Sequence, residues 1–97
     1  MITRGTTPLI TIKLPFEAAE LNAGEIRCGQ AGRVLFVRSL AACTAEADTL
    51  SLFLTEEETL MLDALAPIEA QIIAQNQNGV IVASEIMTDE VGRLLEM

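Results

Sequence analysis

Apolar and polar residues alternate along several short segments of the chain, which is the period of a β-strand that buries one face. Three segments show this alternation most clearly. They are residues 9–14, with Ile10, Ile12 and Leu14 on one face; residues 49–54, with Leu50, Leu52 and Leu54; and residues 67–75, with Ile68, Ala70, Ile72 and Ala74. These aliphatic residues form the predicted core.

Shorter patterns predict the remaining strands. Residues 25–28 place Ile26 and Cys28 inward, and Gln30-Ala31-Gly32 predicts a tight connection to residues 33–38. The continuous apolar run in 33–38 is typical of a strand that is covered on both faces or lies against a partner.

The last part of the chain carries the pattern of a hairpin. Asn78-Gly79 predicts its turn, because this pair readily adopts positive φ angles. The return strand, residues 80–88, is expected to bulge near Ser84, where its apolar phase slips. Residues 91–95 are expected to close the chain.

Helical signals are confined to two places. Residues 16–21 allow one helical turn, and Thr55 with Glu58 forms a capping box that predicts a short helix over 56–63. Leu60 and Met61 are expected to pack onto the core from that helix.

The three glutamates at 56–58 raise the alternative of a metal site. Carboxylates in a first helical turn are favoured by the helix dipole without any metal. The oxygen ligands of a calcium loop alternate along the chain, and these three are consecutive. We therefore predict no metal site.

Together these elements predict an all-β fold, an immunoglobulin-like Greek-key β-sandwich of six or seven strands with one short helix near 56–63. The 97 residues suffice for a single domain, 1–97. The immunoglobulin cysteine pair is absent, because residues 67–75 contain no cysteine to match Cys28. The expected likeness to immunoglobulin domains is therefore architectural.

Two cysteines are too few for a disulfide scaffold, so Cys28 and Cys43 are interpreted as reduced core residues, with a bridge between them as the alternative. The N-terminus lacks the pattern of a secretory signal, and no apolar stretch approaches the roughly 18–20 residues of a membrane span. A soluble protein made in the cytoplasm is expected.

The net charge of −8 is unevenly distributed along the chain. Residues 1–45 carry five basic and three acidic residues, whereas residues 46–97 carry one basic and eleven acidic residues. Such a chain repels phosphate backbones and anionic lipids, so neither nucleic acid nor a membrane is a predicted partner. The asymmetry indicates either a solvated acidic surface or a polar molecule suited to head-to-tail assembly.

The chain contains few of the residues and motifs that enzymes use for catalysis. The chain has no histidine, no phosphate-binding glycine loop and no CxxC pair, so neither cysteine has a histidine to activate it. Paired carboxylates remain possible among the fourteen acidic residues, but three phenylalanines are the only aromatic residues to line a cleft. The predictions are no enzymatic activity, no cofactor and no small-molecule substrate.

Apolar residues on faces that should meet solvent are the more informative signal. They are Leu9, Phe53 and Ile73, with the tail residues Leu94, Leu95 and Met97. Such residues mean little when scattered, but a cluster of them marks an interface. The predicted protein interface therefore contains Leu9, Phe53 and Ile73. Three arginines from the basic first half of the chain contribute to it, namely Arg27, Arg33 and Arg38. This interface is expected to mediate self-association or the binding of a protein partner.

Several short motifs resemble a family of small proteins encoded in prophages and phages of Gram-positive bacteria. The motifs are residues 4–8 running into 10–15, Leu54-Thr55-Glu56-Glu57-Glu58-Thr59-Leu60, the segment 67–75, and Ala83-Ser84-Glu85-Ile86-Met87 followed by Val91-Gly92. The resemblance implies a virion protein of the tail or baseplate, similar in architecture to the N-terminal immunoglobulin-like domain of upper baseplate proteins. It implies no site residues.

The function expected from these observations is a non-enzymatic structural or assembly module of a phage tail or baseplate, acting through protein–protein contacts. Incorporation into a virion would follow from that function. The alternative is a small prophage-encoded regulator or inhibitor that binds a host protein.

Overall fold

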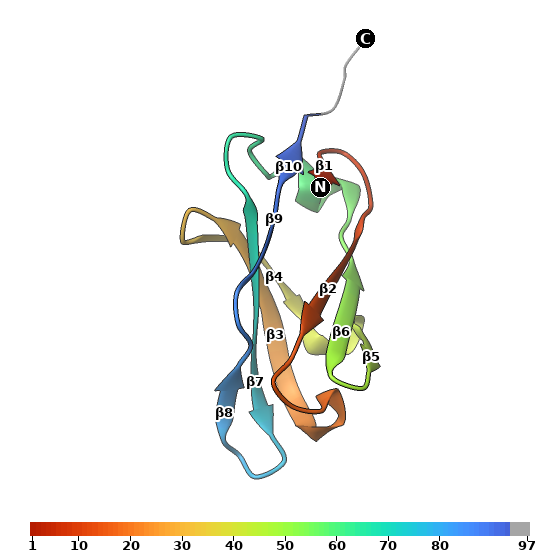
Figure 1. Ribbon diagram of the computed structural model, residues 1–97, viewed down its shortest axis with the longest axis vertical. Helices are drawn as coiled ribbons and strands as arrows, with labels where there is room; N and C mark the ends of the chain where they lie inside the picture. The colour runs from red at the N-terminus through yellow and green to blue at the C-terminus, as the bar shows by residue number, and fades with distance from the viewer. Residues whose placement is uncertain (94–97) are drawn as a thin grey trace.

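Two antiparallel sheets pack against each other in a sandwich-like arrangement in the computed structural model, which describes residues 1–93 (Figure 1). The small sheet has the order β2-β6-β5, formed by Leu9–Lys13, Thr49–Phe53 and Thr44–Glu46. The large sheet has the order β4-β3-β7-β8, formed by Arg33–Ser39, Leu21–Gln30, Ile68–Asn76 and Ile81–Ala83, with β9 (Met87–Asp89) also pairing with β7. The predicted all-β sandwich with one short helix is confirmed.

The core lies between the two sheets, where the alternation predicted it. Ile10, Ile12, Leu50 and Leu52 project from the small sheet, and Ile26, Cys28, Ala70, Ile72 and Ala74 project from the large one, all of them buried. Each buried isoleucine or leucine contributes roughly 1.5–3 kcal/mol by leaving water. The inner faces therefore hold the sandwich together.

The short helices lie in the connections between strands. They are the 3-10 turns η1 (Ala18–Glu20) and η2 (Leu40–Ala42) and the α-helix α1 (Glu56–Leu60). The predicted capping box at Thr55 is present, since its hydroxyl accepts from the Glu58 amide and the Glu58 carboxylate accepts from the Thr55 amide. None of the helices described within residues 1–93 is long and apolar enough to cross a membrane.

The packing predicted for α1 is wrong. The helix ends at Leu60, and both Leu60 and Met61 are exposed, whereas Thr59 and Leu62 are buried. The Thr59 hydroxyl accepts from the Gly5 amide at 3.0 Å and contacts the Thr6 carbonyl oxygen at 2.9 Å. These contacts anchor Thr59 to the N-terminal loop, and Leu62, which follows the helix, reaches the core in place of Leu60 and Met61.

The predicted bulge at Ser84 is present and separates β8 from β9. The Ser84 amide donates to the Ile72 carbonyl, and the Ser84 hydroxyl accepts from the Ile72 amide, both at 2.9 Å. The buried hydroxyl thus replaces the backbone carbonyl that an unbroken strand would offer to β7.

Ten strands are present in residues 1–93 instead of the expected six or seven. The bulge divides one predicted strand, β5 was not predicted, and β3 begins at Leu21 instead of Glu25. The chain ends add β1 (Ile2–Thr3) and β10 (Val91–Gly92), which pair in parallel. The predicted tail contacts of Leu94, Leu95 and Met97 lie outside the described residues.

Candidate protein interface

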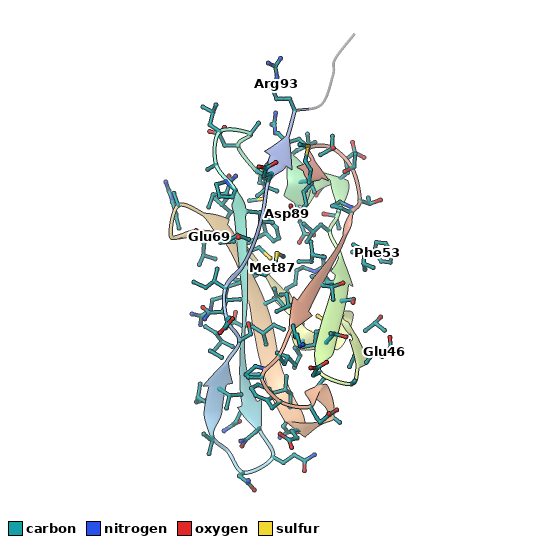
Figure 2. The ribbon with its side chains drawn as sticks, viewed as in Figure 1. Glu46, Phe53, Glu69, Met87, Asp89 and Arg93 are labelled. Carbon is teal, nitrogen blue, oxygen red and sulfur yellow. The ribbon has the colours of Figure 1, made fainter. Side chains whose placement is uncertain are left out.

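The six predicted interface residues do not form one surface. Leu9 and Phe53 lie directly opposite each other on β2 and β6, on the outer face of the small sheet, with 53% and 64% of their surface exposed. Ile73 and Arg27 lie on the outer face of the large sheet, and Arg33 begins β4 at its edge. Figure 2 shows Phe53 and Glu69, which belong to different sheets, on opposite sides of the molecule.

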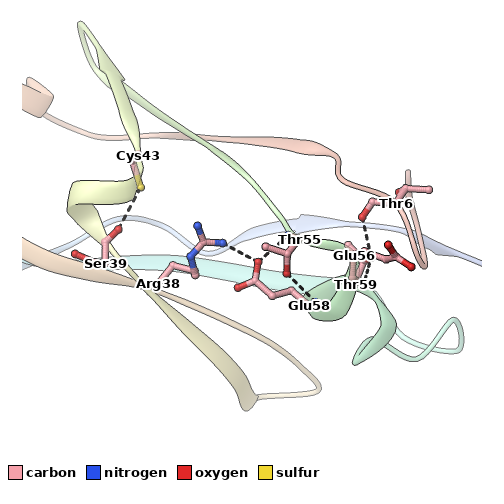
Figure 3. A network of polar contacts seen from close by, with 8 residues as sticks. All are labelled: Thr6, Arg38, Ser39, Cys43, Thr55, Glu56, Glu58 and Thr59. Carbon is pink, nitrogen blue, oxygen red and sulfur yellow. Dashed lines mark hydrogen bonds and ion pairs between the residues drawn. The ribbon is translucent and has the colours of Figure 1, made fainter.

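Arg38 has a different role from the one predicted. It lies opposite the buried Ile26, so its side chain points toward the space between the sheets and not outward. Its Nη1 lies 2.7 Å from the Glu58 carboxylate, which also accepts from the Thr55 amide at 2.8 Å (Figure 3). The ion pair joins β4 to the start of α1 and closes one side of the core.

Both cysteines are free thiols, and neither is activated. Burial raises the pKa of Cys28 to about 12, with a smaller rise from Glu58 that Arg38 opposes. Burial also raises the pKa of Cys43 despite the lowering effect of Arg38. Because the nucleophile is the thiolate, both side chains stay protonated and unreactive near neutral pH.

A shallow hollow of about 170 Å³ lies on the outer face of the large sheet. Its lining residues are Arg27, Gly29, Gly32, Arg33, Val34, Glu69, Ala70, Gln71 and Ile86. A bulge between Cys28 and Gly29 brings β4 so close that a Cβ at Gly29 would overlap the Arg33 carbonyl oxygen. Glycine is required there, and its missing side chain helps to leave the hollow open.

The hairpin beside the hollow is held by a specific contact. Ala31 and Gly32 both have positive φ, as the tight turn between β3 and β4 requires. The Gly32 amide donates to the Glu69 carboxylate at 2.7 Å, which ties the turn to β7. This contact engages Glu69 and fixes one wall of the hollow.

The rim of the hollow combines aliphatic and cationic side chains. Val34 and Ile86 are 53% and 55% exposed, and Val37, which lies opposite Arg27, is 48% exposed. Arg27 lies 3.2 Å from Glu25, whereas Arg33 has no ion pair within residues 1–93. Exposed aliphatic residues beside arginine are typical of surfaces that bind proteins.

The edge of the large sheet adjoins this rim. β4 is the outermost strand, and among the described residues its ladder partner is β3 alone. The backbone groups on its other side are therefore open to pairing with another chain. The exposure of Val34 and Val37 excludes the prediction that residues 33–38 are covered on both faces within this chain.

A second apolar area lies at the end of the molecule that carries the N-terminus and α1. Met1, Leu60, Met61 and Leu65 are all exposed there, around shallow hollows lined also by Arg4 and Arg93. Arg4 donates to the Leu60 carbonyl at 3.1 Å. The apolar side chains of this area lie in loops, in the short helix and at the chain terminus.

The sequence pattern missed Val34, Val37 and Ile86 as surface residues. The signal for the valines was the continuous apolar run of 33–38, which fits an edge strand against a partner as well as a covered strand. Ile86 follows the Ser84 bulge, where the alternation no longer assigns a face.

A comparison of the chain with protein-family models, curated proteins and solved structures finds no match.

Proposed function

We propose that this protein is a non-enzymatic assembly module that binds another protein through the outer face and free edge of its large sheet. The large-sheet surface consists of Arg27, Arg33, Val34, Val37 and Ile86. One observation carries the proposal: half-exposed aliphatic side chains from separate segments lie beside two arginines, next to an unpaired strand edge.

The energetics of this surface favour association. Apolar surface removed from water contributes roughly 25 cal/mol per Å², so covering three aliphatic side chains stabilises a complex. Arginine is enriched among the residues that dominate binding energy, because its planar head group both stacks and donates several hydrogen bonds. The large-sheet surface offers both contributions within one area.

The likeness of the sequence motifs to small phage proteins supports a place in a phage tail or baseplate. The described part of the chain is elongated, with extents of 51 × 23 × 18 Å, and one long side of such a module is suited to contact a neighbour. A prophage-encoded regulator would use the same surface on a host protein. A phage-encoded partner would support the tail or baseplate module, and a host-encoded partner would support the regulator.

The test uses the tagged protein co-expressed with the products of neighbouring genes. Val37→Glu and Ile86→Glu should each lower partner capture by about tenfold or more, as loss of a central apolar contact does. Leu9→Glu is the matched control, since Leu9 is an aliphatic residue of similar exposure on the other sheet. It should leave capture unchanged.

Three results would count against the proposal or part of it. Equal capture by all variants would exclude the large-sheet surface, and loss with Leu9→Glu alone would move the interface to the small sheet. Capture of a host protein by a strain that lacks the phage genes, with the same mutational pattern, would support the regulator instead of the assembly module.

A further inference from the structure

The free edge of β4 is long enough to take an added strand. β4 spans seven residues, whereas β8 and β9 at the opposite edge span three residues each and are interrupted by the Ser84 bulge. Pairing along such an edge uses main-chain hydrogen bonds, so it needs an extended partner segment more than a particular sequence.

The charged residues around β4 indicate which side chains a partner segment should carry. Arg33 and Arg38 lie at the two ends of the strand, and Arg27 lies opposite Val37. Three carboxylates lie nearby, and each is engaged: Glu25 with Arg27, Glu58 with Arg38, and Glu69 with the Gly32 amide. Arg33 is left to attract an acidic residue.

A second copy of the chain fits this edge poorly. Antiparallel pairing of β4 with itself brings the basic ends of two strands together, and like charges opposite each other destabilise a strand pair.

The outer face next to β4 favours apolar side chains between the acidic ones. An added strand runs about 4.8 Å from β4, which places its side chains beside Val34 and Val37. Val34 also lines the hollow, whose volume of about 170 Å³ is several times the roughly 30 Å³ that a water molecule occupies.

We propose that β4 is completed by an extended segment of a partner protein in which carboxylates alternate with aliphatic residues. The segment adds as a strand to the large sheet, its carboxylates face Arg33, and its aliphatic side chains cover Val34 and Val37. This inference rests on the proposed function and names the kind of segment that the large-sheet surface binds.

The probe is a capped synthetic peptide of alternating glutamate and valine, labelled for fluorescence anisotropy. One control replaces glutamate with lysine, and a second methylates the amide nitrogens along one edge, which keeps the side chains but removes the donors. The wild-type protein should bind the glutamate peptide at least tenfold more tightly than either control, and added salt should weaken binding.

Variants and amide shifts locate the bound peptide. Arg33→Glu should lower the affinity for the glutamate peptide by about tenfold, and Arg33→Lys should retain most of it. Backbone amide resonances of β4 should shift on binding, whereas those of β2, an edge strand of the small sheet, should not. The thermal unfolding of each variant checks that it is folded.

The strand-addition proposal fails if the lysine peptide binds equally well, if amide methylation has no effect, or if the β2 resonances shift instead. A dimer by sedimentation that Val37→Glu dissociates would identify a second copy as the occupant and overturn the proposal. Partner capture that depends on Val37 and Ile86 while the glutamate peptide does not bind would retain the proposed function and exclude only strand addition.

Discussion

The inner faces of the two sheets are alike, whereas their outer faces differ. Both inner faces are aliphatic and almost completely buried. On the outer face of the small sheet, the Thr11 and Ser51 hydroxyls lie 3.1 Å apart beside the Leu9–Phe53 pair, whereas the large sheet presents arginines and separate aliphatic side chains around a hollow. Alternation therefore defines the fold through the inner faces, while the outer faces differ in which exposed side chains they bring together.

The largest expected effect separates the two faces of a single strand. Ile72→Ala should lower the free energy of unfolding by about 2–5 kcal/mol, because Ile72 is buried in the core and its truncation leaves a cavity. Ile73→Ala is the matched control, since Ile73 is the next residue on the outer face and only partly buried. Its cost should be about 1 kcal/mol or less. Equal losses in urea denaturation would contradict the assignment of faces.

A smaller loss in the free energy of unfolding is expected from the truncation of a buried serine, and an exposed serine provides the control. Ser84→Ala should cost about 1–3 kcal/mol, because it leaves the buried Ile72 amide without the acceptor that now lies at 2.9 Å. Faster hydrogen exchange of that amide would identify the cause. Ser51→Ala on the outer face of the small sheet should cost less than about 0.5 kcal/mol, because solvent can replace its contact. If Ser84→Ala left the free energy of unfolding unchanged, the bulge would not depend on the Ser84 hydroxyl.

The sequence predicted the inner faces well because period-two alternation directly reports which side of a strand is apolar. It could not say which outward residues are neighbours, since that depends on pairing between distant strands. Leu9 meets Phe53 through the β2–β6 ladder, and Arg38 turns inward because it lies opposite Ile26. The sequence could not predict the hollow either, because the hollow depends on the bulge at Gly29 and on the segment between β8 and β9, which carries Ile86.

The inner face should also respond to alkaline pH through Cys28. Its pKa is about 12 in the folded protein against 9.0 for an ordinary thiol, so the unfolded state loses its proton first as pH rises. Stability is therefore unaffected below about pH 9 and falls above it, by roughly 1 kcal/mol at pH 10. Denaturation under reducing conditions should show this slope, and Cys28→Ala should remove most of it. Burial also raises the pKa of Cys43, which therefore contributes in the same direction, and a smaller slope should remain in the Cys28→Ala variant.

The smallest effect on stability is expected at Phe53, and it decides between the two outer faces. Phe53 is 64% exposed and its main neighbour across the ladder is Leu9, a kind of pair that contributes about 0.2–1 kcal/mol. Phe53→Glu should therefore change the free energy of unfolding by no more than about 1 kcal/mol. Because Phe53 lies on a different sheet from Arg27 and Arg33, the substitution should also leave partner capture unchanged in the co-expression experiment. If Phe53→Glu abolishes capture while the protein melts normally, the small sheet provides the interface that the sequence pattern predicted, and the large-sheet surface does not.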